Sequence, residues 1–277
     1  MTQAQKAAAL LELHHAAGPV VFINAWDAAS AAIIEQCGFP AIATSSAAVA
    51  NALGYADGQN VPFPEMLAAI QRITRSVSVP VTADIESGFA ADVRQLESSI
   101  EQVIRAGAVG VNLEDAIRGA DRGELFPLPE QIARIQAARR AAQRLNIHLV
   151  INARVDAYWQ SGVEPADALR NTIERGAAYL KAGGDCIFVP GLRKPEHIRQ
   201  MVEQWHAPIN ILAGPGVPSI PELTRLGVKR VSYGSGPYRA AMALLRRMAT
   251  EANSTGTYNA LTQESVPHAE MNALFKK

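Results

Sequence analysis

Three apolar stretches of the sequence end in charged residues, which are Asp84 and Glu86, Glu114 and Asp115, and Arg154 and Asp156. Carboxylate oxygens that converge on one point, with no histidine or cysteine beside them, suit Mg2+ or Mn2+ better than zinc. An arginine in the same place binds an anionic substrate through a fork of hydrogen bonds. The pattern therefore predicts a metal-assisted site for a small acid.

Structural interpretations of the same residues stay open. Asp84 and Glu86 stand two residues apart, so in a strand both side chains point to one side. Two carboxylates in one pocket repel each other unless a cation or a shared proton relieves them, but either one can instead cap a helix or pair with an arginine. Glu114 adds a third oxygen ligand from the adjacent strand. Arg154 either holds the substrate or neutralises one of these acids, and the two roles are compatible.

Two further segments carry weaker signals. Small residues follow the second apolar run, at Ser45, Ser46, Ala47 and Ala48. They let a ligand approach backbone N–H groups that bind an anionic oxygen, although hydroxyl residues are also common where helices begin. The loop over 51–64 contains Asp57 before a glycine, a pair that by itself most often marks a turn.

The elements that must position these residues alternate along the chain. Buried strands are predicted at eight short, β-branched runs, over 20–25, 41–46, 79–85, 109–115, 149–154, 186–191, 209–214 and 230–235. Helices are predicted between them, over 27–38, 63–76, 92–106, 129–145, 164–182, 195–205 and 219–226. Glycine ends several of these helices before the next strand, as in AGAVGVNL. The alternation predicts a (β/α)8 barrel of the TIM type, with chemistry at the carboxyl ends of the strands, and an open doubly wound sheet is the alternative.

Residues 1–277 are interpreted as one barrel domain with a C-terminal helical extension from about 237. The first 15 residues predict a short helix, and 237–250 predict a strongly apolar one followed by a partly helical tail. The helix over 237–250 either closes its own barrel or packs on a neighbouring subunit, and the sequence does not decide between the two.

Composition narrows the function classes. Lysine plus arginine and aspartate plus glutamate both number 26, so no basic surface favours nucleic acid as a partner. No apolar run approaches the roughly 18 residues that span a membrane, and the polar start lacks the features of a secretory signal. Cys37 and Cys186 lie in apolar surroundings, which favours two buried thiols in a reducing compartment over a disulfide. We expect a cytoplasmic protein.

The order of the motifs carries a resemblance to a known family. FINAWDAASA, ATSSAAVANALGYADGQ, VTADIESGF, GVNLEDA and NARVDA follow one another as in the isocitrate lyase / phosphoenolpyruvate mutase superfamily, over roughly residues 18 to 240. The resemblance implies a (β/α)8 barrel that binds Mg2+ and acts on small α-keto or α-hydroxy carboxylates. It also implies that a C–C or P–C bond beside a carbonyl is made or broken, and that the protein is a homo-oligomer, either a tetramer or a dimer.

The resemblance also implies roles for individual residues. Asp84 is similar to the direct metal ligand, Glu86 stands where many members have Asp and would act through water, and Glu114 resembles the third carboxylate around the metal. Arg154 resembles the arginine that grips the substrate, and Asp57 resembles the loop aspartate near the reacting group. The remaining matches are Ser45, Ser46 and the Ala47 and Ala48 backbone as an oxyanion cradle, and Trp26 and Asp27 in the substrate-side loop.

Two departures from the family pattern bear on the reaction. The Lys-x-Cys-Gly-His loop of the isocitrate and methylisocitrate lyases is absent, because Ile117–Leu125 contain no cysteine. That segment also lacks the Lys and Asn of the phosphonate enzymes, although Arg118 and Arg122 can supply charge, and Pro190 replaces a histidine of the mutase branch. We expect this loop to close over the site.

These departures favour a Mg2+-dependent C–C lyase of the oxaloacetate decarboxylase or dimethylmalate lyase kind. A P–C bond enzyme, either a phosphonopyruvate hydrolase or a mutase, and a non-catalytic carboxylate-binding barrel are the alternatives. The catalytic residues would be Asp57, Glu114 and Arg154.

Overall fold

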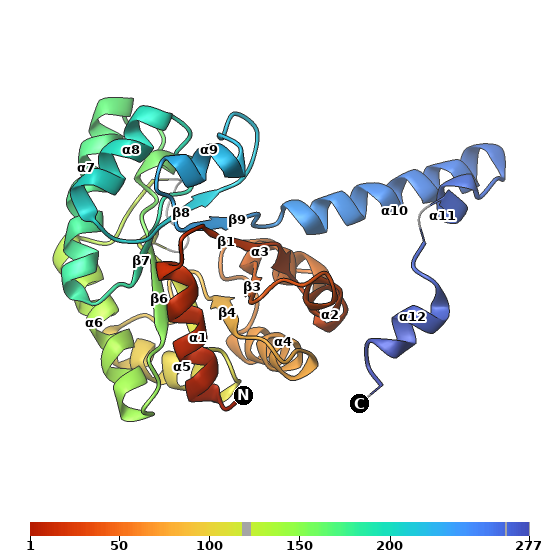
Figure 1. The fold of residues 1–277 in the computed structure, drawn as a ribbon, viewed down its shortest axis with the longest axis horizontal. Helices are drawn as coiled ribbons and strands as arrows, with labels where there is room; N and C mark the ends of the chain where they lie inside the picture. Colours follow the sequence, from red (N-terminus) through yellow and green to blue (C-terminus); the bar gives the residue numbers. More distant parts are fainter. Residues whose placement is uncertain (118–122, 264, 277) are drawn as a thin grey trace.

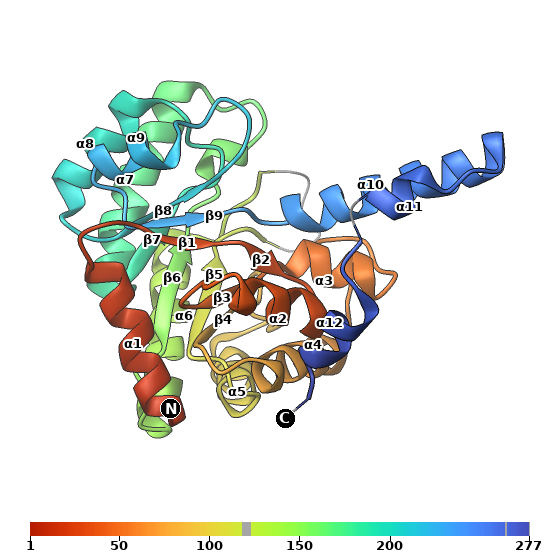
Figure 2. The same cartoon turned by 45° about the vertical axis from the view of Figure 1, so that its right-hand side comes forward.

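The computed structural model describes residues 1–117, 123–263 and 265–276. Parallel strands form a barrel that helices surround, as Figures 1 and 2 show from two directions. The strands are β1 (Val20–Phe22), β2 (Asn24–Ala25), β3 (Ile42–Thr44), β4 (Val81–Asp84), β5 (Gly110–Glu114), β6 (Val150–Arg154), β7 (Cys186–Phe188), β8 (Ile209–Leu212) and β9 (Arg230–Ser232). The predicted (β/α)8 barrel is therefore confirmed.

The barrel closes at the first predicted strand, over 20–25, which the structure divides into β1 and β2. β1 pairs with β9, whereas β2 pairs with β3, so together they complete the ring of strands. The side chain of Asn24 bridges the two neighbours, since its Nδ2 donates to the Thr44 carbonyl at 2.8 Å and its Oδ1 accepts from the backbone N–H groups of Tyr233 and Gly234, both at 2.9 Å. Nine segments thus fill eight strand positions.

The helices between strands begin and end within a residue or two of the predicted positions. They are α2 (Ala28–Gln36), α4 (Phe63–Ser76), α5 (Val93–Arg105), α6 (Leu128–Arg144), α7 (Pro165–Ala182), α8 (Pro195–Trp205) and α9 (Ile220–Arg225). In α5, Leu96, Ile100 and Val103 recur at helical spacing and are fully buried, while Asp92 caps the helix by accepting from the Gln95 N–H at 2.8 Å. A short helix that the sequence pattern did not predict, α3 (Ser46–Ala52), follows β3.

The amino-terminal helix α1 (Gln3–His15) closes the end of the barrel opposite the predicted site. Its Leu10 is fully buried and lies so close to the start of β5 that a Cβ at Gly110 would meet Leu10 Cδ2 at 2.8 Å. His14 is also buried, and its Nδ1 lies 2.7 Å from the Leu10 carbonyl while its Nε2 lies 3.3 Å from a guanidinium nitrogen of Arg230. Since Arg230 has no acceptor atom, Nε2 must be the acceptor, which makes His14 a neutral imidazole with its proton on Nδ1.

The C-terminal part of the chain leaves the barrel. Figures 1 and 2 show α10 (Gly236–Thr255) projecting from the body, with α11 (Asn259–Gln263) folded back along it and α12 (His268–Ala273) beyond. None of the α10 residues is buried, and Leu245 is 57% exposed. The predicted helix over 237–250 is present, and only its start contacts the barrel, where Tyr238 packs against Trp26.

Two smaller observations complete the fold. No helix among the described residues is long and apolar enough to cross a membrane. Cys186 is buried as predicted and both cysteines are free thiols, but the prediction for Cys37 was wrong, because this residue is exposed where it caps the end of α2.

We expect His14 to make the free energy of unfolding depend on pH. Burial, followed by the charge of Arg230, lowers the pKa of His14 from 6.5 to about 4. The unfolded chain binds the proton more readily, so the fold loses stability as pH falls below about 6.5, by roughly 2 kcal/mol down to about pH 5. Urea unfolding of a His14→Gln variant should lack this loss, so its stability relative to the wild type should improve as pH falls. The exposed neighbour provides the control, because His15→Gln should follow the wild type at every pH; a His14→Gln difference that does not change with pH would contradict the argument.

Candidate active site

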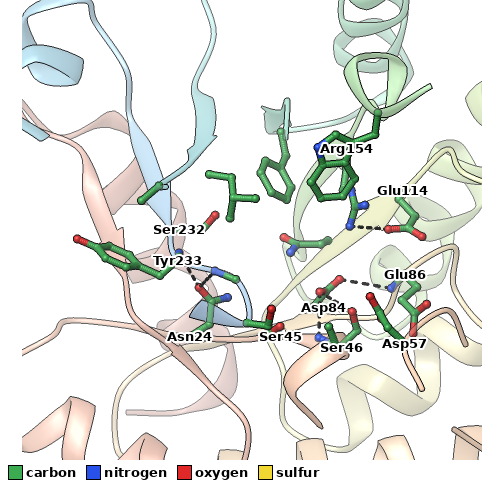
Figure 3. A pocket seen from close by; sticks show the side chains of 18 of the residues that line it. Asn24, Ser45, Ser46, Asp57, Asp84, Glu86, Glu114, Arg154, Ser232 and Tyr233 are labelled. Carbon is green, nitrogen blue, oxygen red and sulfur yellow. Dashed lines mark hydrogen bonds and ion pairs between the residues drawn. The ribbon is translucent and has the colours of Figure 1, made fainter. Parts of the chain in front are cut away.

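A cavity of about 240 Å3 opens at the carboxyl ends of the strands. Eight of the residues singled out from the sequence line it, namely Ser45, Ser46, Ala47, Asp57, Asp84, Glu86, Glu114 and Arg154. Figure 3 shows Asp84, Glu114 and Arg154 around this cavity at the ends of neighbouring strands, with Glu86 and Asp57 beside them. The structure thus brings together Ser45 and Arg154, which are more than a hundred positions apart in the chain, as the predicted barrel requires.

Asp84 is held at the end of β4 by residues of the preceding strand and helix. Its Oδ2 accepts from both the backbone N–H and the hydroxyl of Ser46, at 3.0 and 2.8 Å, while its own N–H donates to Thr44 Oγ1 at 2.9 Å. The first turn of α3 therefore fixes the carboxylate through two donors. Ser45 has a different task here, because its hydroxyl caps α3 by accepting from the Ala48 N–H at 3.4 Å.

Glu86 enters the cavity from a turn, and the prediction that it shares a strand face with Asp84 was wrong. β4 ends at Asp84, and Glu86 has a positive φ of 51°, a left-handed backbone that non-glycine residues adopt at some cost. The turn ends at Gly88, whose φ is 95° and where a Cβ would come within 2.2 Å of Leu96. Burial, then the nearby charges of Asp84 and Asp57, raise the pKa of Glu86 to about 8.

Arg154 is paired with two carboxylates on the wall of the cavity. Its Nη1 lies 2.6 Å from Glu114 Oε2 and its Nε lies 2.7 Å from Asp156 Oδ1, with Trp159 stacked 4.8 Å from the guanidinium carbon. Burial alone would lower the pKa of Arg154, but Asp156 and Glu114 outweigh it and raise the pKa, so the guanidinium stays charged. The structural role proposed for Arg154 from the sequence is present, and the guanidinium keeps further N–H groups for a ligand.

Asp115 points away from the cavity and holds the ends of β5 and β6 together. It is fully buried, and its Oδ2 accepts from the Tyr179 hydroxyl at 2.6 Å and from Arg175 Nη1 at 3.2 Å. Its Oδ1 accepts from the backbone N–H of Asp156 at 2.9 Å. Burial and the nearby Asp156 raise the pKa of Asp115 to about 6. The side chain therefore supports the segment that carries Arg154 without facing the cavity itself.

Three sequence-predicted substrate residues do not line the cavity. Ala48 lies inside α3, and Trp26 packs its ring edge-on against Tyr238 at the start of α10, with centroids 5.4 Å apart. Asp27 caps α2 by accepting from the Ser30 N–H at 2.7 Å, which turns the chain outward after Trp26. By contrast, Asp57 sits on an exposed loop at the mouth, where its Oδ1 accepts from the Gly58 N–H at 2.9 Å.

The residues present fit a Mg2+ ion. Glu86 Oε1 is buried without a hydrogen-bond partner among the described residues. The acidic side chains that line the cavity with it offer carboxylate oxygens as metal ligands. Within the described part of the chain, no three acidic, histidine or cysteine side chains already stand close enough to hold an ion. Mg2+ usually binds one or two carboxylates and keeps several waters, so this donor set suits it.

Sequence reasoning missed Asn24 on β2, Asn112 on β5 and the residues that the later strands and the start of α10 contribute to the cavity. Asn24, Asn112, Phe188, Leu212, Ala213, Ser232, Tyr233, Gly234, Ser235 and Arg239 also line it. Figure 3 shows Asn24 and Ser232 across the cavity from Glu114 and Arg154. Most of these residues are uncharged, so a search for charges at strand ends overlooks them. The strand-end rule itself would have found Phe188, Leu212 and Ser232, which end β7, β8 and β9.

The segment expected to close over the site is described only at its two ends. Ala116 and Leu125 form an antiparallel bridge, and the Ile117 N–H donates to the Glu124 carbonyl at 2.9 Å. Both ends therefore lie side by side, and with Glu124 they line a second pocket that shares Asp57, Arg154 and Trp159 with the cavity. Arg118 and Arg122 lie outside the described residues.

We expect Arg154→Met to destabilise the fold. The substitution leaves Glu114 and Asp156, which are 12% and 5% exposed, without their cation, at a cost of about 3 kcal/mol or more. Urea unfolding near neutral pH should show this loss, and the loss should shrink at lower pH as the two carboxylates take up protons. Arg239→Met is the matched control, because Arg239 lines the same cavity but is exposed, and it should change stability by less than about 0.5 kcal/mol. Equal effects of the two substitutions would refute the buried ion pair as the cause.

Comparison with known proteins places this arrangement in a family. A family model described as phosphoenolpyruvate phosphomutase matches residues 10–253. Oxaloacetate decarboxylase of Pseudomonas fluorescens is 31% identical over 226 residues, covering 79% of this chain and 75% of that protein. A structure from Burkholderia cenocepacia with a provisional lyase/mutase assignment is 35% identical with a TM-score of 0.91, covering 99% of this chain and 97% of the other.

A phosphonopyruvate hydrolase solved with oxalate and Mg2+ is 26% identical with a TM-score of 0.83, covering 97% of this chain and 94% of the other. The family match spans most of the barrel and all of the cavity residues named above. The chain therefore belongs to the isocitrate lyase / phosphoenolpyruvate mutase superfamily of carbon–carbon lyases and mutases.

Proposed function

We propose that this protein is a Mg2+-dependent lyase that cleaves a C–C bond in a small α-keto or α-hydroxy di- or tricarboxylate, as an oxaloacetate decarboxylase or a dimethylmalate lyase does. The observation that carries the proposal is the convergence of Asp84, Glu86 and Glu114 with Arg154 in one cavity at the carboxyl ends of β4 to β6. This arrangement gives a site for both a hard cation and a small anion.

The metal would be held by Asp84 directly and by Glu86 and Glu114 through water. Ser46 fixes the direction of the Asp84 carboxylate with two hydrogen bonds, so this ligand is preorganised. When bound, Mg2+ supplies positive charge that stabilises an enolate of the pyruvate type, an effect usually worth several kcal/mol. Mn2+ has similar preferences and is a second candidate ion.

The chain's own residues would bind the substrate and exclude water. Arg154 would present its remaining N–H groups to a substrate carboxylate, and the backbone N–H of Ala47, which lines the cavity in the first turn of α3, would be a further donor. Phe188, whose ring centroid lies 5.8 Å from the Arg154 guanidinium carbon, and Leu212 add apolar surface to the cavity, which would keep water from the developing charge. Asp57 at the mouth is the carboxylate free to take or give a proton, because Glu114 is engaged by Arg154.

Phosphonopyruvate hydrolysis or mutation is the second candidate, since the family model and one matched structure carry phosphonate activities in their names. A phosphonate carries more charge than a carboxylate and needs more cations. Among the described lining residues, Arg154 is already paired with two carboxylates and Arg239 stands at the exposed rim. The apolar surface and this shortage of cations favour the C–C lyase.

The proposal is tested by turnover with Mg2+ and, separately, oxaloacetate, 2,3-dimethylmalate and phosphonopyruvate. Release of CO2 or a keto acid that stops with EDTA is the expected result. Asp84→Ala should lower kcat/KM at least about a hundredfold, because it removes several kcal/mol of charge stabilisation. Asp167→Ala, on the exposed face of α7, is the matched control and should leave kcat/KM unchanged.

Other outcomes separate the alternatives. Inorganic phosphate from phosphonopyruvate would replace the C–C lyase by the phosphonate enzyme. Binding of Mg2+ and oxalate without turnover of any of the three acids would replace it by a barrel that binds carboxylates without catalysis.

We further propose that the protein is a homo-oligomer in which α10 packs on a second copy. A barrel helix normally covers the strand that precedes it, but α10 leaves β9 and buries no residue of its own, while Met242 and Leu245 stay 38% and 57% exposed. Exposed apolar residues along one helix commonly mark an interface.

Light scattering after gel filtration is expected to give a multiple of the 29.6 kDa chain mass for the wild type. Leu245→Arg should shift the mass to that of a single chain, because it buries a charge at the contact. Val163→Arg changes another exposed apolar residue, 37% exposed and on the body of the barrel, and should not shift the mass. A wild type that elutes as a single chain would end this proposal.

A further inference from the structure

The barrel interior below the cavity is polar, where such barrels usually pack branched apolar side chains. One layer of inward-facing residues lies two positions before the cavity-lining residues on the same strands, and one of its members also lines the cavity. The members of this layer are Thr82, Asn112, Asn152, Cys186, Asn210 and Arg230. All are buried, and Asn152, Asn210 and Arg230 are fully so. Buried polar groups are costly unless they are paired, so this layer needs an explanation.

Asn112 is the member of this layer that reaches the cavity. Its Oδ1 accepts from Asn152 Nδ2 at 2.8 Å and from Arg230 Nη2 at 3.2 Å. Because a guanidinium has no acceptor, the Asn112 atom that faces Arg230 must be the oxygen. The amide nitrogen is then turned toward the other side, and no described residue accepts a hydrogen bond from it.

The position of Asn112 in the barrel puts this free N–H beside the expected ligand. Its Cα is the register partner of Asp84 on one side and of Asn152 on the other, and Glu114 is two residues further on the same face. Below it, Arg230 carries a fully buried charge that forms no ion pair with any described residue. A buried positive charge without a partner favours an anion above it, since little solvent screens it.

We propose that Asn112 Nδ2 donates a hydrogen bond to an oxygen of the bound carboxylate substrate, and that Asn152 and Arg230 hold the Asn112 amide in the orientation that allows it. The inference rests on the proposed function, because it assumes that a small carboxylate occupies the cavity. Asn112 on β5 would thus add a neutral hydrogen-bond donor at the bottom of the cavity to the charged residues on its walls.

Binding of oxalate, a small dianion of the substrate class, tests the inference by calorimetry on the full-length protein in the presence of Mg2+. Asn112→Asp keeps the size of the side chain and both accepted hydrogen bonds, so the fold should be kept, but it cannot donate while ionised. Asn112→Ala removes the donor without adding charge. Both variants should bind oxalate about tenfold more weakly or worse, as expected for the loss of one hydrogen bond to a charged oxygen.

Two internal controls accompany the measurement. Binding of Mn2+, followed by electron paramagnetic resonance without oxalate, should stay within about threefold of the wild type for Asn112→Ala, because the metal-binding carboxylates are untouched. The thermal midpoint of Asn112→Asp should not fall, since its carboxylate pairs with Arg230. A purely structural role would instead lower the midpoint and weaken Mn2+ and oxalate binding together.

The outcomes are distinct. Normal oxalate binding by either variant overturns the inference. Normal binding by Asn112→Ala would mean that the donor is not needed or is replaced by an ordered water, so that any weaker binding by Asn112→Asp comes from its added charge. Normal binding by Asn112→Asp would mean that no donor is needed at this position. A wild type that binds Mg2+ but not oxalate would overturn the proposed function instead, and the inference with it.

Discussion

The constraint on which the site depends is the concentration of negative charge at one end of the barrel. Asp57, Asp84, Glu86 and Glu114 line a single small cavity, and Arg154 is the cation placed among them on the wall. Carboxylates in so confined a place repel one another, and burial adds to the cost of ionising each of them. Burial, followed by the charges of Asp84 and Asp57, raises the pKa of Glu86 to about 8, as this cost predicts. A divalent cation would relieve this repulsion, so carboxylates that are costly to bring together make the cavity a good site for a metal.

The barrel resists this repulsion through its strand register. β5 and β6 pair over their whole length, so Glu114 and Arg154 are Cα partners at the last position and their side chains meet as an ion pair. Asp115 anchors both strand ends from behind through Tyr179 and Arg175, where it is shielded from the cavity. On the other side, α3 begins at Ser46 and directs two donors at Asp84. Each charged group is thus oriented by an element that buries apolar surface elsewhere, so the stability of the core holds the site in place.

Much of this was predictable from the sequence, and the exceptions have physical reasons. The spacing of apolar residues and the placement of glycines predicted the strands and helices, because buried parallel strands and helix ends leave strong local signals in the sequence. The strand-end rule then found Asp84, Glu114 and Arg154, which the barrel necessarily brings together. Glu86 was assigned a strand geometry because alternation cannot reveal a left-handed residue, which the surrounding turn imposes. Trp26 was misplaced because the direction of a loop depends on a partner, Tyr238, more than two hundred residues away.

Asn112 shows why neutral site residues are hardest to predict. In the sequence it is one polar residue inside an apolar run, which fits a satisfied core amide as well as a ligand contact. Its meaning depends on Arg230, which comes from the last strand of the barrel and fixes which end of the amide faces the cavity. The polar layer that results costs the barrel part of the apolar packing it would otherwise have, and it leaves polar atoms of Thr82, Asn152 and Asn210 without partners among the described residues. Proteins commonly accept such costs where function requires them. A stable barrel with an apolar floor would present no donor from below, so the substrate would be gripped from the walls alone.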